Sequence, residues 1–350
     1  MSTGPVGTPE KTNMDKSKTS ISTPVPAPAE PLRILFMGTP DFAAVSLRAL
    51  SEYTARCGGR LIGVFTREDK PSGRGYKLTP PPVKVLAEEL GLPVFQPKTL
   101  RTEEAMETLR ALDPNLIIVI AYGRILPREV LDYPAYGCIN VHGSLLPEYR
   151  GAAPMQRAMI DGKTVTGITT MYMNEGIDTG DMLLRREVPI GADDDFGILH
   201  DRMAAAGADL LTETLDALCD GRLTRTPQTD EGASYAAKIE KSDCRLDFER
   251  PASELYDLIR GTSPAPLAWT HTPDGKLLKI AAARLLQTPD AHDAAPGTVT
   301  ALDGRGEGGI TVACGKGSLI FTRVLPEGKG RMSAAEFIRG RKINEGDRLS

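Results

Sequence analysis

The sequence predicts an α/β protein whose doubly wound first domain is followed by a small C-terminal β-barrel. Up to Gly221, short apolar strands alternate with helical stretches, which is typical of a parallel sheet with right-handed crossovers. After Gly221 the pattern changes to short strands separated by glycine-rich turns, which favours a small barrel. With 350 residues the chain is long enough for both domains.

The first domain is predicted from runs of apolar residues, of which 116–121 is the clearest because it is continuous and β-branched. Strands are expected at 33–37, 61–65, 94–95, 116–121, 138–142, 167–173 and 180–188. Helices are expected at 41–50, 82–90, 102–112, 153–160 and 196–218. Asp41 is the expected N-cap of the first helix, and the aspartates at 193–195 are expected to cap the last. The alternation indicates a Rossmann-like, doubly wound sheet.

The second domain follows a polar, irregular stretch at 222–234. A short helix at 252–260 precedes strands expected at 277–283, 297–302, 309–314 and 318–325. This pattern favours an OB-fold, a class of barrel that often binds oligonucleotides. The basic C-terminal stretch 321–350, with seven Lys or Arg against four acids, is compatible with that use but also with solvated loop charges.

Composition excludes several classes of protein. The net charge is -4, so no global field indicates nucleic-acid binding. The five cysteines form no C-x-x-C pair or Cys/His cluster, which argues against a zinc site or a disulfide framework, and no metal is expected. Free thiols fit a reducing compartment, so a cytoplasmic protein is expected. No apolar run approaches the ~20 residues that a membrane span needs, and no membrane partner is expected.

The first 31 residues are rich in Ser, Thr, Pro, Lys and Ala and contain few large apolar side chains. Such a segment cannot bury enough surface to offset chain entropy, so residues 1–31 are expected to be a disordered extension. They lack the apolar core of a signal peptide and the arginines of a transit peptide.

Asn140 and His142 are the most informative pair of residues. They lie two apart at the end of an expected strand, so both side chains point to the same face. An amide donor beside an imidazole suits a carbonyl that becomes a tetrahedral oxyanion. No nearby Ser or Cys is placed as a nucleophile, so the attacking group is expected to come from the substrate. A structural role for His142 is about equally compatible with the spacing alone.

An acidic partner is expected in the glycine-bracketed loop that follows strand 167–173. Asp178 lies between Gly176 and Gly180, which allow a sharp backbone path that aims its carboxylate. Spacing alone leaves Glu175 and Asp181 as rivals, and an ordinary turn as the alternative.

Two loops can be compared as possible phosphate-binding sites, and the sequence favours the second. The turn at 38–41 lacks the G-x-G-x-x-G pattern, so a tight strand–helix turn is expected there and not a nucleotide site. The connection 66–80 is longer than most, and Gly73 and Gly75 flank Arg74 near its tip. Five basic residues against two acids in 67–84 make a phosphate backbone a natural target for this loop.

Taken together, these segments resemble the folate-dependent formyltransferases. The run 140–154, NVHGSLLPEYRGAAP, and the loop 176–180, GIDTG, are similar to the signature of that family. The stretches FMGTPDFA at 36–43 and GRGYKL at 73–78 resemble its methionyl-tRNA formyltransferases, as do PVK at 82–84 and GLPVFQP at 91–97. The similarity runs from about Leu32 to the C-terminus and is strongest up to Glu187. The family often has Asn-Pro-x-Pro where this chain has Ser-Pro-Ala-Pro at 263–266.

The resemblance implies a role for each matching position. The catalytic residues would be Asn140, His142 and Asp178. The folate co-substrate would contact two segments. One consists of Ser144, Leu145, Leu146 and Pro147, and the other of Ile125 and Leu126. The tRNA would contact Arg74 and Lys77. The domains would be an extension over 1–31, a formyltransferase catalytic domain over 32–221, a linker over 222–240 and an OB-like tRNA-binding domain over 241–350.

The implied reaction moves a formyl group from 10-formyltetrahydrofolate to the α-amino group of methionine on initiator tRNA, in a protein expected to be a monomer. Asn140 and His142 would stabilise the oxyanion, and Asp178 would orient His142 and favour its protonated form. A formyltransferase for a sugar nucleotide or glycinamide ribotide would share these three residues. A nicotinamide-dependent dehydrogenase would need the missing glycine pattern, and a non-catalytic tRNA-binding protein would not need Asn140 and His142 together.

Overall fold

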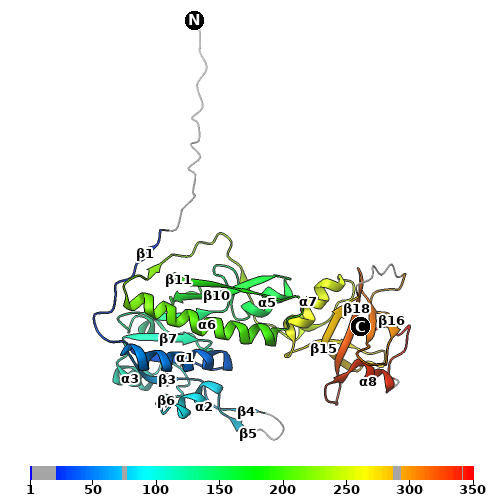
Figure 1. Cartoon of the computed structure of the whole chain (residues 1–350), viewed down its shortest axis with the longest axis horizontal. Coiled ribbons are helices and arrows are strands. Elements are labelled where there is room, and N and C mark those ends of the chain that lie inside the picture. The colour runs from blue at the N-terminus through cyan, green and yellow to red at the C-terminus, as the bar shows by residue number, and fades with distance from the viewer. Residues whose placement is uncertain (2–20, 73–76, 287–292, 341) are drawn as a thin grey trace.

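The computed structural model describes residue 1 and residues 21–72, 77–286, 293–340 and 342–350. Its first half is built on a seven-stranded sheet with the order β11-β10-β8-β7-β2-β3-β6 (Figure 1). The strands are β2 (Arg33–Gly38), β3 (Arg60–Phe65), β6 (Val94–Phe95), β7 (Leu116–Ile120), β8 (Cys138–His142), β10 (Val165–Tyr172) and β11 (Met182–Pro189). The five strands from β6 to β8 are parallel and follow the order of a doubly wound sheet.

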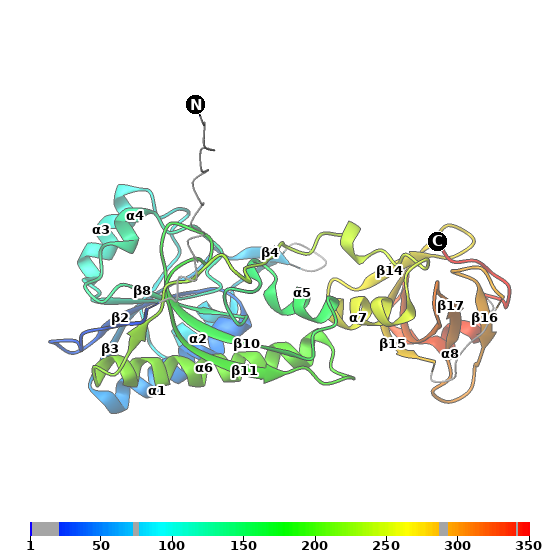
Figure 2. The same ribbon diagram turned by 90° about the horizontal axis from the view of Figure 1, so that it is seen from above.

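Helices cover both faces of this sheet, as Figure 2 shows. One face carries α1 (Asp41–Cys57), α2 (Pro82–Glu89) and α6 (Phe196–Cys219), and the other carries α3 (Glu103–Leu112) and α4 (Arg128–Leu131). Alternate residues of β2 therefore enter different cores: Ile34 lies in one and Leu35 in the other. Burial on both faces explains why these strands are continuous apolar runs in the sequence.

The predicted strands exist, but the sheet is not parallel throughout. β10 runs antiparallel to β8, and β11 runs antiparallel to β10. The connection from β10 to β11 spans only residues 173–181, which is too short for a helical crossover and therefore makes a hairpin.

One of the two predicted helix caps is confirmed. The Asp195 side chain accepts a hydrogen bond from the Ile198 amide and caps α6. Asp41 is not the cap of α1, because Pro40 occupies that position in an extended conformation and Asp41 is already helical. The Asp41 carboxylate instead accepts from the neighbouring Phe42 amide in the first turn.

Part of the N-terminal extension is ordered, contrary to the prediction. Residues 2–20 lie outside the described residues. Strand β1 (Thr23–Pro24) pairs antiparallel with β12 (Thr224–Arg225), and Val25 packs against the main core. Composition does not reveal this order, because the segment has too few apolar residues to form a core of its own. It is ordered by packing against the core of the first domain.

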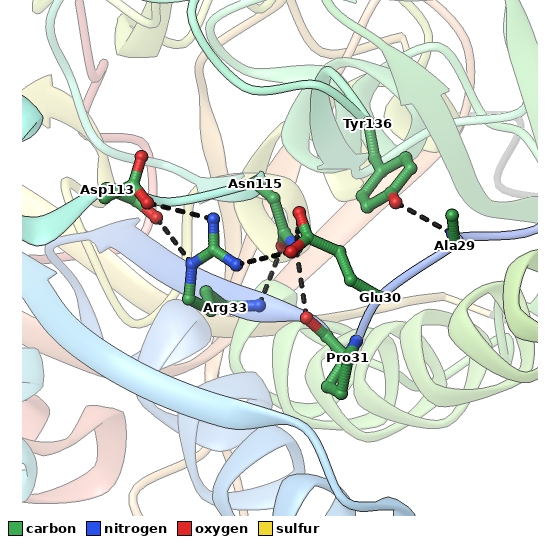
Figure 3. A network of polar contacts seen from close by, with 7 residues as sticks. All are labelled: Ala29, Glu30, Pro31, Arg33, Asp113, Asn115 and Tyr136. Atoms are coloured by element: carbon green, nitrogen blue, oxygen red, sulfur yellow. Dashed lines mark hydrogen bonds and ion pairs between the residues drawn. The ribbon is translucent and has the colours of Figure 1, made fainter.

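A polar network fixes the chain between this strand and β2 (Figure 3). The amide of buried Asn115 donates to the Pro31 carbonyl and accepts from the Arg33 backbone, at 3.0 and 2.7 Å. Arg33 also pairs with Glu30 and Asp113, both at 3.0 Å. The Tyr136 hydroxyl accepts from the Ala29 amide at 2.9 Å.

Residues 222–240, expected to be a linker, lie against the first domain. Besides β12, they contain β13 (Tyr235–Ala236), which pairs with β9 (Arg150–Gly151). Thr226 forms an antiparallel bridge with Met182 of β11. The polar composition of this segment hides these contacts because the hydrogen bonds are made by its backbone.

The C-terminal half has its own core and forms a separate lobe (Figure 1). Its sheet has the order β14-β15-β18-β17-β16, with β19 paired to β18. The elements are η1 (Ser242–Cys244), α7 (Ala252–Thr262), β14 (Ala268–His271), β15 (Leu277–Leu285), β16 (Val299–Leu302), β17 (Ile310–Ala313), β18 (Ser318–Pro326), β19 (Met332–Ser333) and α8 (Ala334–Arg339). The last residues link the sheet's two edge regions, because Ser350 bonds to His271 and Arg348 bridges to Thr298.

None of the helices in the described part of the chain combines the length and the apolar character that crossing a bilayer requires.

Candidate active site

Asn140 and His142 lie at the C-terminal end of β8, where the sheet opens to a cavity of about 830 Å³. Strand alternation puts both side chains on the same side, and both residues are largely buried, with 9% and 5% of their surface exposed. Within the described residues, no hydrogen-bonding partner is found for the Asn140 side chain, although it lines the cavity. Its amide is therefore available to a bound molecule.

The two ring nitrogens of His142 have different surroundings. Nε2 lies 3.0 Å from the backbone oxygen of Tyr149, and because a carbonyl only accepts, Nε2 is the nitrogen that donates. Nδ1 lies 3.6 Å from the Asp178 carboxylate, which is longer than a hydrogen bond. Nδ1 is thus the nitrogen left to exchange a proton with a ligand.

Tyr149 is itself held in place. Its hydroxyl donates to Asp161 at 2.9 Å, and burial together with this bond raises the pKa of the Tyr149 phenol. The phenol therefore stays protonated and continues to donate near neutral pH. This contact helps to fix the backbone oxygen that positions His142.

Of the three acids in the loop after β10, Asp178 is the one that faces His142. Glu175 is exposed, and Asp181 lies 3.6 Å from Arg225. The Asp178 carboxylate accepts from the Gly151 amide at 2.8 Å, through the same oxygen that faces His142. Asp178 has a left-handed backbone, with φ of 52°, and its carboxylate faces His142 at the end of β8.

Gly151 was not identified from the sequence, although it lies in the NVHGSLLPEYRGAAP run. Its φ is +116°, and a Cβ atom at this position would lie 2.9 Å from the Ala236 backbone oxygen. Both conditions require glycine. The close approach arises from the pairing of β9 with β13, which no local pattern in the sequence indicates.

Further cavity walls come from distant parts of the chain. Phe196 and His200 of α6 line it, as do Asp41 after β2 and Pro264 of the C-terminal half. His200 lies 3.5 Å from the Asp41 carboxylate, which ties the start of α1 to α6. Sequence reasoning missed Pro264 because its approach depends on how the two halves pack. The lining includes no Ser, Thr, Cys, Lys or Tyr among the described residues.

The residues predicted to contact folate lie beside the cavity and are not among its lining residues. Ser144 is fully buried and donates to the Glu148 backbone oxygen at 2.6 Å. The segment from Ser144 to Pro147 is held by Thr169, whose hydroxyl bonds to the Ser144 oxygen and the Leu146 amide. In this segment Leu146 is buried, and Leu145 and Pro147 are partly exposed.

The two residues of the second predicted folate segment differ in their exposure. Ile125 is 80% exposed, whereas Leu126 is buried in the core beneath α3 and α4. Their neighbours Ala121 and Gly123 line the cavity. The assignment of both segments to folate stays a prediction.

The predicted tRNA loop is a hairpin of β4 (Lys70–Ser72) and β5 (Lys77–Thr79). Arg74 lies outside the described residues, and Lys77 begins β5. The base of the hairpin is anchored by Lys84, which lies 2.9 Å from Asp69, and by Gln96, which donates to both Asp69 and the Arg67 backbone oxygen. Hydrogen bonds from Gln96 and Lys84 hold the pKa of Asp69 below its usual value.

No group of three or more His, Cys, Asp or Glu side chains arranged to bind a metal is found in the described ranges.

Two family models match the chain. The model described as "Formyl transferase" matches residues 32–215, and "Formyl transferase, C-terminal domain" matches residues 238–342. Among curated relatives, a methionyl-tRNA formyltransferase of Symbiobacterium thermophilum is 51% identical over 91% of this chain and 95% of its own length. One of Citrifermentans bemidjiense is 48% identical over 91% and 96%.

Solved structures share the fold at lower identity. HypX from Aquifex aeolicus in complex with tetrahydrofolic acid superposes with a TM-score of 0.59 at 19% identity, covering 88% of this chain and 47% of that one. A sugar N-formyltransferase from a Shewanella species gives a TM-score of 0.56 at 23% identity, covering 73% and 98%.

Proposed function

The chain belongs to the methionyl-tRNA formyltransferase family, and we propose that the cavity around Asn140, His142 and Asp178 is where it transfers the formyl group. The donor is 10-formyltetrahydrofolate, and the acceptor is the α-amino group of methionine on initiator tRNA. The observation that carries this assignment is one cavity in which the Asn140 amide, without a hydrogen-bonding partner among the described residues, lies beside the His142–Asp178 pair.

The substrate amine is the nucleophile. Among the described residues, the cavity lining offers no hydroxyl, thiol or amine of the protein for this role, which supports direct attack on the formyl carbon. A new bond joins the amine nitrogen to that carbon, and the carbonyl oxygen becomes an oxyanion. Asn140 donates to the oxyanion from its side-chain amide.

Proton transfer completes the reaction. Nδ1 of His142 accepts the proton that the attacking amine loses, because Nε2 is occupied by the Tyr149 carbonyl. Asp178 stabilises the imidazolium formed in this step. The bond between the formyl carbon and N10 of the folate then breaks, and the proton passes to N10.

Two other parts of the chain are proposed to bind the tRNA. In this proposal Arg74 and Lys77 of the β4–β5 hairpin contact the acceptor end, and the domain over 241–350 binds the tRNA body as an OB-fold. The antiparallel sheet and the C-terminal residues linking its edge regions support a closed barrel. In this proposal the enzyme acts as a monomer in the cytoplasm, where charged tRNA is found.

The test is transfer of a labelled formyl group to charged initiator tRNA, with a sugar nucleotide and small amines offered in competition. His142→Ala should lower kcat by roughly 10²–10⁴, the contribution typical of a residue that transfers the proton. Asp178→Asn should also lower kcat, whereas the matched variant Asp181→Asn should not, because Asp181 faces Arg225. Wild-type turnover in His142→Ala would overturn the site assignment. Preferential formylation of a small amine would overturn the acceptor.

A further inference from the structure

The segment between the two domains contacts the candidate active site directly. Residues 228–236 lie against both backbone segments that hold the Asp178 carboxylate. On one side, β13 pairs with β9 and supports the Gly151 amide that donates to Asp178. On the other side, the side chain of Gln228 reaches the loop that contains Asp178.

Gln228 bonds to this loop through its amide nitrogen. Nε2 donates to the backbone oxygen of Asp178 at 2.9 Å and to that of Gly180 at 2.8 Å. Both hydrogens of the amide are used, so the loop is held at two points that bracket Thr179. This contact constrains the backbone of Asp178 and not its carboxylate.

The other end of the Gln228 amide is held by a buried cation. Nε of Arg150 donates to the Gln228 side-chain oxygen at 3.0 Å, and Arg150 is only 2% exposed. Its remaining nitrogens face the Thr229 backbone oxygen and the exposed Asp230. Arg150 precedes Gly151, so one amide side chain joins the two segments that converge on Asp178.

The backbone conformations at this point explain why such support is needed. Asp178 has a φ of 52°, and a residue other than glycine persists in this region only where its surroundings fix it. Strain of this kind gathers at functional sites. Without Gln228, the loop would lose its two bonds to the Asp178 and Gly180 carbonyls, and the 3.6 Å approach of Asp178 to His142 would no longer be held from behind.

We propose that Gln228 is a positioning residue for the transfer reaction, which acts by holding the Asp178 loop so that the carboxylate faces His142. The inference rests on the proposed function of Asp178. It assigns a role in catalysis to the segment that joins the domains, outside the 32–215 match to the formyltransferase model.

The sharpest variant is Gln228→Glu. A glutamate keeps the size and still accepts from Arg150, but an ionised carboxylate cannot donate to the two carbonyls. We expect kcat to fall by about tenfold, because the loop loses both hydrogen bonds from Gln228 and no longer holds the Asp178 carboxylate toward His142. KM for folate and tRNA should be nearly unchanged. Glu231→Ala is the matched control, because Glu231 is exposed in the same segment and should leave kcat unchanged. Gln228→Ala is the second variant if the glutamate impairs folding.

A double variant separates positioning from a general loss of structure. Single-turnover rates are measured for Gln228→Glu, Asp178→Ala and both together. If Gln228 acts through Asp178, its substitution has no further effect once Asp178 is removed. If Gln228→Glu reacts as fast as Glu231→Ala while Asp178→Ala is impaired, the positioning role alone is overturned. If Gln228→Glu causes an equal loss of rate in the wild-type and the Asp178→Ala backgrounds, the positioning role is likewise overturned. A fully active Asp178→Ala overturns the proposed function of Asp178 and this inference with it.

Discussion

Gly151 shows at the scale of a single residue how backbone geometry supports the chemistry. Its amide donates to the Asp178 carboxylate, and its α-carbon lies against the Ala236 carbonyl. That Asn140 and His142, the side chains proposed to act in the reaction, share one face could be predicted from strand alternation alone. Gly151 could not, because its neighbour Ala236 is distant in sequence.

Gly151→Ala should therefore destabilise the fold by about 1–3 kcal/mol, since the new Cβ atom combines a strained φ with a contact to backbone. We also expect a lower kcat, because the displaced amide no longer holds Asp178. Thermal melting and formyl-transfer kinetics measure the two effects. Gly58→Ala is the control, because Gly58 has a φ of +73° with nothing within 4 Å. Equal effects in both variants would show that strain alone matters and the Ala236 contact does not.

At the scale of elements, local pattern predicted where strands lie but not always what they pair with. The runs that became β7 and β8 are buried on both faces, so their apolar character is continuous and visible in the sequence. The antiparallel pairing of β11 with β10 follows from their short connection, and the pairing of β1 depends on a partner that is distant along the chain. The two paired residues of β1 are too few to produce a periodic pattern of apolar residues in the sequence.

The docking of the N-terminal segment can be tested at Asn115. Asn115→Ala should lower the free energy of unfolding by about 1–3 kcal/mol, because it leaves the Arg33 amide and the Pro31 carbonyl without their partner. Tyr136→Phe removes only the bond to Ala29 and should cost about 0.5–1.5 kcal/mol. Urea unfolding followed by circular dichroism provides both values. Unfolding of Asn115→Ala at the wild-type midpoint would contradict the docked arrangement.

At the scale of the whole molecule, the two halves meet where α7 packs against α5 (Pro154–Ile160). Gly261 of α7 allows this approach, since a Cβ atom there would lie 2.8 Å from Ile160 and 3.3 Å from the Gln156 backbone oxygen. The same packing brings Pro264 to the cavity wall. The proposed active-site cavity is thus completed by the contact between the halves.

Gly261→Ala should push α7 away from α5 and destabilise the protein by about 1–3 kcal/mol. Trp269, the single tryptophan, lies in β14 just beyond α7, and its fluorescence reports unfolding of the C-terminal half in guanidinium. Ser253→Ala, at an exposed position of the same helix, should leave the midpoint unchanged. If the Gly261 variant unfolds like the Ser253 variant, α7 does not need this close contact.

The sequence by itself determined the succession of the main strands and helices and placed Asn140 and His142 on one face, because both depend on periodicity within a few residues. The tertiary structure decided which of three acids faces His142 and which ring nitrogen remains available. It also decided that Gln228 and Pro264 belong near the site. These outcomes depend on contacts between segments far apart in the chain, which are fixed only when the sheet, the connecting segment and the second half pack together.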